Sequence, residues 1–167
     1  MYDELTKVDI EKMQAELDHR RRELRPKLIE EVQTARAFGD LSENYEYKVA
    51  KQEKNRNESR IRYLERMIAT AKVIEVNEKE GTVGLFDHVV LFNEKLGKEQ
   101  SIQLVTTLRQ NALKGLISKE SPVGRAILGK RIGERVEVAV SPEMKYTVEI
   151  RSIALGEDDS SLEISSY

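Results

Sequence analysis

The sequence predicts an α+β protein with two domains: a long antiparallel helical hairpin, followed by a small domain built on a mostly antiparallel sheet. The first observation is that Gly39 and Pro26 are the only helix-breaking residues between Leu5 and Val73. The second is that the apolar spacing drops to two after about Val76, which is typical of strands. Charged residues make up 35% of the chain and the mean hydropathy is −0.56, so much of the surface is exposed.

The first arm of the hairpin carries apolar residues at alternating steps of three and four, with a polar gap at Arg20 and Arg21. Such steps place the side chains on one face of a helix. Pro26 lies inside this arm and removes one backbone hydrogen bond, so we expect it to bend the helix. The apolar positions are Ile10, Met13, Leu17, Leu24, Leu28, Val32 and Ala35.

The second arm shows a clearer heptad seam. A seam of this kind winds two helices into a left-handed coiled coil. Because isolated helices are marginal in water, each arm needs the other to bury its stripe, and a hairpin that closes within one chain predicts a monomer. The seam consists of Tyr47, Ala50, Lys54, Asn57, Ile61, Leu64, Ile68 and Ala71, with Lys54 and Asn57 as polar interruptions.

The turn between the arms carries two carboxylates, Asp40 and Glu43. Gly39 before them can take the left-handed conformation that ends a helix. Asp40 followed three residues later by Glu43 is typical of a capping box for the second helix. The pair has a second interpretation, because Mg²⁺ prefers oxygen ligands and usually takes one or two carboxylates from a protein. Two carboxylates are enough to complete a metal site that another molecule has half built, and the spacing alone leaves both interpretations open.

Basic side chains cluster on the second arm, and they too have two interpretations. Exposed Lys and Arg on a charged helix often pair with Glu one turn away. Alternatively, they contact the phosphates of a nucleic-acid strand that lies along the arm, with Tyr45 and Tyr47 near the turn available to stack on bases. Tyr47 also lies on the seam, which favours packing. The cluster comprises Lys48, Lys51, Lys54, Arg56, Arg60, Arg62 and Arg66.

The second half predicts a small sheet domain. Ser121 and Pro122 are typical of the N-cap and first position of a short helix, which Gly129 would end. From Gly156 onward, acidic residues among serines predict a flexible tail. The expected domains are therefore 1–75, 76–155 and 156–167. The strand candidates are Val73–Val76, Thr82–Phe86, Val89–Phe92, Ile102–Val105, Val136–Val140 and Val148–Ile150, with a turn at Leu96–Lys98.

Composition argues against several classes of function. The chain has no cysteine, which excludes disulfides and thiolate metal sites, and its two histidines argue against a His-rich metal site. A net charge of −2 argues against a free-standing nucleic-acid binder. No apolar run approaches the roughly 18 residues that span a bilayer. The acidic start, Met1–Leu5, is not typical of a signal peptide. We expect a cytoplasmic protein with no membrane partner.

The residues around the turn resemble the Gre family of bacterial transcript-cleavage factors. The resemblance covers nearly the whole chain in order, and Leu41 after Asp40 is closer to the GreA branch. It rests on Ala35–Tyr47 followed by Ala50–Lys51, with support from Leu5–Thr6, Leu17, Arg25–Pro26 and Ser121–Lys130.

The resemblance implies a coiled-coil N-terminal domain and an FKBP-like C-terminal domain that docks on bacterial RNA polymerase through Ser121 and Pro122. The hairpin then enters the secondary channel of the polymerase. By the same resemblance, we expect Asp40 and Glu43 to share a Mg²⁺ with the polymerase and to stimulate its own cleavage of the 3′ end of backtracked nascent RNA. The chain is then expected to be no enzyme by itself and to hold no tight cofactor. The resemblance also implies tip support for Ser42 and Tyr47 and contact with RNA or polymerase for Asn44. From the aromatic and basic residues themselves, we expect tip support or RNA contact for Tyr45, and RNA-phosphate contact for Lys48, Lys51 and Arg56.

Three departures from the family pattern leave alternatives open. The segment Thr106–Asn111 replaces an expected acidic, glycine-containing run, Tyr45 stands where a small residue is usual, and the acidic tail extends beyond the usual end. The first alternative is a Gre-like regulator of the polymerase channel that does not stimulate cleavage. The second is a coiled-coil interaction scaffold with an appended sheet domain.

Overall fold

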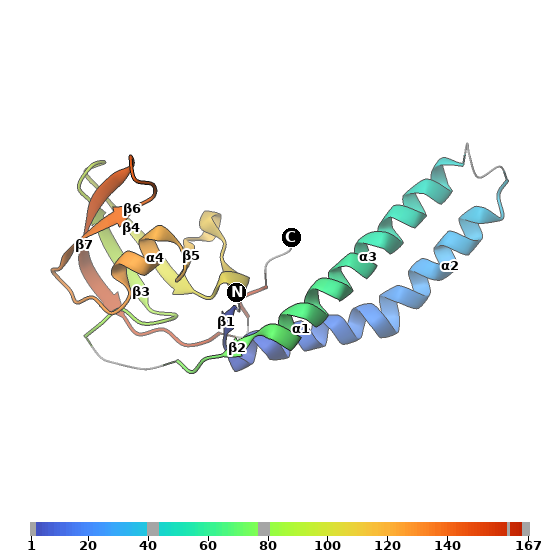
Figure 1. The fold of residues 1–167 in the computed structure, drawn as a ribbon, viewed down its shortest axis with the longest axis horizontal. Helices are drawn as coiled ribbons and strands as arrows, with labels where there is room; N and C mark the ends of the chain where they lie inside the picture. The colour runs from blue at the N-terminus through green and yellow to red at the C-terminus, as the bar shows by residue number, and fades with distance from the viewer. Residues whose placement is uncertain (1–2, 40–43, 77–80, 160, 165–167) are drawn as a thin grey trace. The chain divides into compact units, whose positions relative to one another are not determined.

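The computed structural model describes residues 3–39, 44–76, 81–159 and 161–164. The chain divides into two compact units (Figure 1). The hairpin unit consists of Met1–Asp3 and Ile10–Ala71, and the sheet unit consists of Glu4–Asp9 and Lys72–Tyr167. The sheet unit thus takes a short segment from before the hairpin, whereas the sequence suggested one continuous domain for residues 1–75.

The first arm of the hairpin is helical throughout and contains one wider turn. Helix α1 (Lys7–His19) continues through the π-helical turn η1 (Arg20–Leu24) into α2 (Arg25–Arg36). The backbone N–H of Arg25 donates to the carbonyl of Arg20, five residues earlier. Pro26, which has no N–H to donate, follows this turn at the start of α2. The first arm therefore accommodates Pro26 by a local change from α-helical to π-helical hydrogen bonding, and the helix is not broken.

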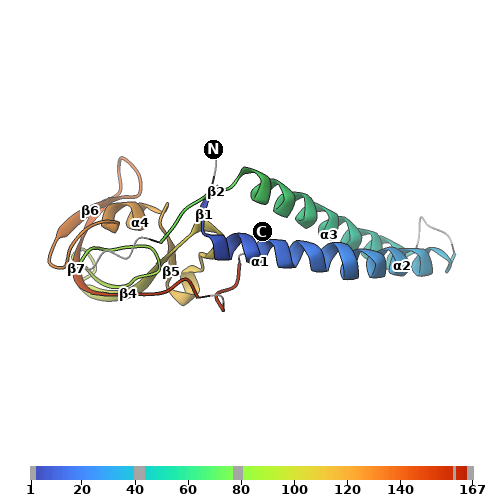
Figure 2. The ribbon, with the colours of Figure 1, turned by 90° about the horizontal axis from the view of Figure 1, so that it is seen from below.

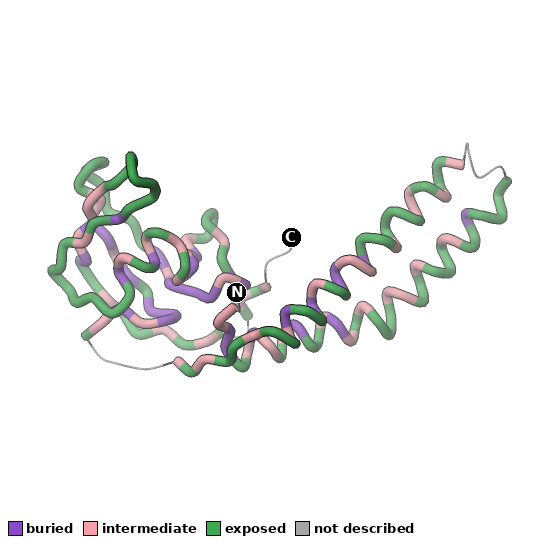
Figure 3. Tube along the Cα trace, viewed as in Figure 1, coloured by how far each residue is buried: buried purple, intermediate pink, exposed green. Residues whose placement is uncertain are grey.

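The second arm is a single helix, α3 (Tyr45–Thr70), which runs beside the first arm in both views (Figures 1 and 2). Every seam position that the sequence predicts in the two arms is buried or half-buried, so the prediction of a coiled-coil hairpin is confirmed. Fully buried apolar side chains concentrate in the half that contains α1, at Met13, Leu17, Ile61 and Leu64 (Figure 3). Among the described residues, no helix is long and apolar enough to cross a membrane.

Beyond these apolar layers, the two arms are joined by charged and amide groups. Glu16 accepts from Nε and Nη2 of Arg60 at 3.1 and 3.0 Å, and from Nε of Arg20 at 3.1 Å. The Oδ1 atom of Asn57 accepts from Arg20 Nη1 at 2.9 Å. Asn57 and Arg60 are both buried. The polar interruption of the seam is therefore a hydrogen-bonded layer, and Arg60 belongs to it and not to an exposed basic surface.

The sheet unit contains a five-stranded sheet of order β5-β4-β3-β7-β6. All neighbours in it are antiparallel except the parallel pair β4 and β5. A separate parallel pair joins the strands on either side of the hairpin, β1 (Glu4–Leu5) and β2 (Lys72–Val73). The sheet strands are β3 (His88–Asn93), β4 (Lys98–Val105), β5 (Leu116–Ser118), β6 (Arg135–Ala139) and β7 (Lys145–Ala154); the short helices are η2 (Thr107–Arg109), η3 (Ala112–Lys114) and α4 (Pro122–Ile127).

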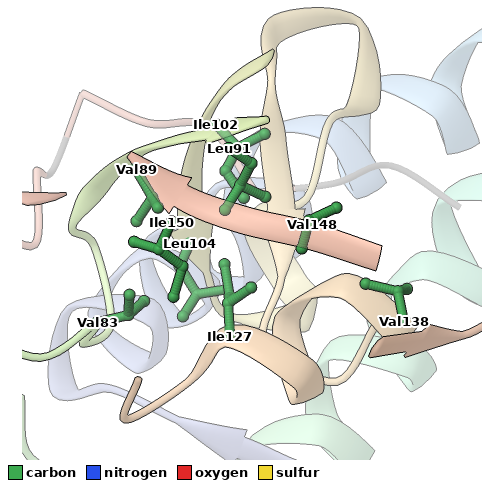
Figure 4. Close-up of a cluster of buried hydrophobic side chains, with 9 residues drawn as sticks. All are labelled: Val83, Val89, Leu91, Ile102, Leu104, Ile127, Val138, Val148 and Ile150. Atoms are coloured by element: carbon green, nitrogen blue, oxygen red, sulfur yellow. The ribbon is translucent and has the colours of Figure 1, made fainter. Parts of the chain in front are cut away.

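One face of this sheet carries the core of the unit. Residues two apart on β3, β4 and β7 point to the same side, where Ile127 of α4 meets them (Figure 4). The alternating apolar residues that predicted these strands therefore form the inward face of the sheet. The core consists of Val83, Val89, Leu91, Ile102, Leu104, Ile127, Val138, Val148 and Ile150.

Most of the predicted strands are confirmed, and so is the α+β class. The strand predicted at Thr82–Phe86 is wrong, because only Thr82 forms an isolated bridge, to Arg131. A carboxylate oxygen of Asp87 accepts from the backbone N–H of Gly84 at 2.8 Å, and Phe86 adopts a φ of +69°. These two features turn the chain, and a turn cannot continue a ladder of strand hydrogen bonds.

The Glu16 layer makes the hairpin sensitive to acid. Burial acts to raise the pKa of Glu16, but its hydrogen bonds to Arg60 and Arg20 and their charges outweigh burial and hold this pKa below its ordinary value of 4.5. A carboxyl whose pKa is lower in the folded than in the unfolded state contributes stability above its unfolded pKa. That stability is lost as the pH falls through the lowered pKa.

We predict that Glu16→Gln lowers the melting temperature of the hairpin at pH 7, and that the deficit shrinks as the pH falls below about 4.5, because protonated Glu resembles Gln. Thermal melts followed by helical circular dichroism between pH 7 and pH 3 measure this difference. Glu11→Gln is the matched control, since Glu11 is exposed on the same helix. A deficit that stays constant over this pH range would contradict a role for the charge.

Candidate functional site

The candidate site lies at the turn of the hairpin. Helix α2 ends at Arg36, and Gly39 follows with a φ of +128°, which glycine tolerates best. The residues at the centre of the sequence prediction, Asp40, Ser42 and Glu43, lie outside the described residues. Elsewhere, in the part of the chain that the structure describes, no three His, Cys, Asp or Glu side chains gather closely enough to hold a metal ion.

Asn44 begins the second helix. Its Oδ1 accepts from the backbone N–H of Tyr47 at 3.1 Å, which makes it the N-cap of α3. Its Nδ2 donates to the carbonyl of Ala35 at 2.6 Å, near the end of α2. The prediction that Asp40 caps the second helix is therefore wrong. Asparagine is among the favoured N-cap residues, so this alternative cap was visible in the sequence.

Aromatic side chains flank the turn on both arms. Tyr45 is 76% exposed and Phe38 is 72% exposed. Tyr47, on the seam, is half-buried, and the Lys51 ammonium lies 6.0 Å from its ring centroid. Phe38 was not among the predicted site residues, although it stands next to Gly39. It also lines a groove of about 450 Å³ between α2 and α3, together with Lys27, Glu30, Glu31, Thr34, Ala35, Glu46 and Ala50.

The basic residues predicted to contact RNA are exposed on α3. Lys48, Lys51 and Arg56 all face solvent. Among the described residues, no carboxylate forms an ion pair with any of the three. Lys48 and Lys51 are three residues apart and share one helix face, which lies to the side of the seam. The described part of the hairpin therefore provides no carboxylate for these three residues, and their charges are available to a partner.

The residues predicted to dock on a partner belong to the sheet unit, in a turn formed by residues 118–124, here called the Ser121 turn. Ser121 Oγ donates to the carbonyl of Ser118 at 2.6 Å and accepts from the N–H of Gly124 at 3.0 Å. A Cβ atom on Gly124 would lie 2.2 Å from the Ser118 carbonyl oxygen, so only glycine fits. Ser121 is half-buried by these bonds, whereas Pro122 is exposed. The turn presents Pro122 on a rigid support.

Two family models match the chain in succession. Residues 4–73 match "Transcription elongation factor, N-terminal", and residues 78–155 match "Transcription elongation factor, GreA/GreB, C-term". A charged helical hairpin joined to a small sheet unit is thus the architecture of a transcription elongation factor. The chain belongs to the GreA/GreB family, as the residues around the turn predicted.

Similar proteins include several named transcription elongation factor GreA. That of Thermosipho melanesiensis is 40% identical over 145 residues, covering 86% of this chain and 92% of that protein. That of Mesoplasma florum is 40% identical over 152 residues, covering 89% and 96%. Among solved structures, the GreA factor homolog Gfh1 of Thermus thermophilus matches with a TM-score of 0.43 and 30% identity, over 92% of this chain and 99% of that one.

We predict that Asn44→Ala frays the first turn of α3 and costs about 1 kcal/mol, because the Tyr47 N–H and the Ala35 carbonyl lose their partner. Hydrogen exchange at the amides of Tyr47 and Lys48 measures the effect. Asn55→Ala is the control, since Asn55 is exposed inside the same helix and alanine is a better helix former there. Equal exchange in the two variants would show that Asn44 does not hold the turn.

Proposed function

We propose that this elongation factor binds bacterial RNA polymerase, inserts its hairpin into the secondary channel, and stimulates cleavage of the 3′ end of backtracked nascent RNA. The observation that carries the proposal is the pair of carboxylates Asp40 and Glu43 at the turn of a hairpin whose arms are joined by partly buried ion pairs. In this proposal the polymerase owns the catalytic centre and the chain has no nuclease activity alone.

The length of the hairpin suits a residue that must act at a distance. Helix α3 has 26 residues, which corresponds to roughly 39 Å at 1.5 Å per residue. Such a helix places its first turn roughly that far from its last turn. Asn44 joins the ends of α2 and α3, so the two arms deliver the intervening residues together.

The donor set at the turn suits Mg²⁺, because carboxylate oxygens are the ligands this ion takes from proteins. We propose that Asp40 and Glu43 would hold such an ion only together with the polymerase. When bound, the ion would supply an activated water and stabilise the charge of the reacting phosphate. The task of the chain is to bring these two carboxylates to a site that is incomplete without them.

The basic face of α3 and the Ser121 turn have separate tasks in this proposal. Lys48, Lys51 and Arg56 contact the phosphates of the extruded RNA, and Tyr45 stacks on a base or supports the tip. Ser121 and Pro122 contact the rim of the polymerase channel. Reaction and docking are therefore divided between the two units of the chain.

A regulator that occupies the channel without stimulating cleavage is the second candidate. The segment Thr106–Asn111 favours it, since the family resemblance leads to an acidic run there, and this chain has Arg109 as the only charged residue of the segment. The intact spacing of Asp40 and Glu43 favours cleavage, because occupancy of a channel needs no such pair.

We predict that Asp40→Ala and Glu43→Ala each reduce RNA cleavage by about 100-fold or more, the range seen when a group that stabilises transition-state charge is removed. The assay uses a stalled, backtracked complex of bacterial polymerase with labelled RNA and Mg²⁺. Glu46→Ala is the matched control, since Glu46 is an exposed carboxylate in the first turn of α3. Polymerase affinity should be retained in all three variants.

Each outcome of this assay discriminates between the candidates. Binding of the wild-type chain without acceleration of cleavage would replace the proposal with the non-cleaving regulator. Loss of polymerase binding in Asp40→Ala would contradict the division between docking unit and reactive turn. No binding by the wild type would overturn both candidates.

We also predict that the double variant Lys48→Ala/Lys51→Ala binds the backtracked complex less tightly and with a weaker salt dependence. Each lost phosphate contact to a single strand lowers the slope of log affinity against log salt by about 0.7, so two contacts lower it by about 1.4. The affinity is measured with and without extruded RNA. Lys95→Ala, an exposed lysine of the sheet unit, is the control. An equal loss of affinity with and without extruded RNA would show that the two lysines contact protein.

A further inference from the structure

Arg109 is fully buried in the sheet unit and binds two carboxylates. Its Nε lies 2.6 Å from Asp9 Oδ1, and its Nη1 lies 2.5 Å from Asp158 Oδ1. Nη1 also donates to the backbone carbonyl of Asp159 at 3.1 Å, and the guanidinium lies 5.2 Å from the Phe86 ring centroid. One arginine thus joins residues from the start, the middle and the end of the sequence.

The end of the chain fits closely onto the sheet unit. The N–H of Gly156 donates to Asp87 Oδ1 at 3.2 Å, and a Cβ atom on Gly156 would lie 1.7 Å from the Phe86 carbonyl oxygen. Further along, Leu162 packs against the apolar cluster of Leu85, Phe86, Val105 and Leu116. The sequence predicted a flexible acidic tail from Gly156 on; the structure gives this segment a glycine-only contact, an ion pair and an apolar anchor.

A second set of contacts connects this segment to the Ser121 turn through β1. Thr6 Oγ1 donates to Asp158 Oδ2 at 2.6 Å, and Thr6 directly follows β1. In β1, the Glu4 carboxylate pairs with the ammonium of Lys119, whose hydrogen bond and charge lower the pKa of Glu4. Lys119 stands two residues before Ser121, and its backbone N–H donates to the Val105 carbonyl at 2.9 Å.

We propose that residues 156–159 and 161–164 form a latch that closes on Arg109 and positions the Ser121 turn for docking on RNA polymerase. Arg109 and Asp158 are positioning residues in this scheme: they fix β1 through Asp9 and Thr6, and β1 fixes Lys119. The docking part of the proposal rests on the proposed function, whereas the latch itself concerns contacts within the sheet unit.

The physical reason for the coupling is the cost of a buried charge. A guanidinium with no exposed surface is tolerated because carboxylates and a carbonyl surround it, and removal of one partner leaves it poorly compensated. Movement of Arg109 or β1 toward water then lowers the free energy of the poorly compensated charge. Either movement loosens the Glu4–Lys119 pair, because Thr6 and Glu4 are separated by only one residue. The Ser121 turn is thereby sensitive to a side chain that it does not touch.

The first test is hydrogen exchange in the full chain without polymerase. Asp158→Asn keeps the size of the side chain and removes its charge, and the control is Glu157→Gln, an exposed neighbour. We expect the amides of Lys119 and Ser121 to exchange about tenfold faster in Asp158→Asn and at the wild-type rate in Glu157→Gln. Unchanged exchange in Asp158→Asn would overturn the latch, whatever the chain does to polymerase.

The second test separates positioning from general destabilisation. In the RNA-cleavage assay, Asp158→Asn should raise the factor concentration for half-maximal cleavage several-fold and leave the rate at saturation unchanged. In a double-mutant cycle, Asp158→Asn and Lys119→Met should be non-additive, because both act through β1. Additive effects, or a reduced rate at saturation, would overturn the positioning role. Faster exchange at Ser121 with unchanged polymerase affinity would overturn the docking part alone.

Discussion

The carboxylate of Glu16 ties the two arms of the hairpin to each other. It receives hydrogen bonds from Arg60 on the opposite arm and from Arg20 on its own arm, and Arg20 in turn bonds Asn57. Apolar packing alone does not fix how one arm aligns along the other, because leucine and isoleucine layers tolerate shifted registers. A partly buried, directional layer of this kind accepts one alignment and penalises the rest.

That alignment matters because the turn is where the proposed function lies. Beyond the ionic layer, toward the turn, Ala35 is the only buried apolar residue among those described. The outer part of the hairpin is held instead by the Arg25–Glu58 pair, at 2.7 and 2.9 Å, and by the two hydrogen bonds of Asn44. Because few apolar residues are buried near the turn, Phe38, Tyr45 and the first two lysines of α3 are exposed there, and this part of the hairpin depends on polar contacts.

The sequence predicted the hairpin and most strands because their signals are local and periodic. The seam from Tyr47 to Ala71 could be predicted from the spacing of its residues alone. The cap was misplaced because Asp40 and Asn44 satisfy the same local rule, and the strand at Thr82–Phe86 was wrong because the Asp87 carboxylate competes for the backbone. The contacts of Asp158 with Arg109 and Thr6 join positions far apart in the chain, and an acidic stretch carries no local sign of which arginine it meets.

The parallel pairing of β1 with β2 has a topological consequence. Because Glu4–Asp9 belongs to the sheet unit, the hairpin is an insertion between two paired strands, whose backbones lie about 4.8 Å apart as in any sheet. A hairpin inserted in this way can gain or lose matching heptads in its two arms while its two ends remain paired in β1 and β2. The length of the hairpin can therefore change in evolution independently of the sheet unit, which carries the proposed docking surface.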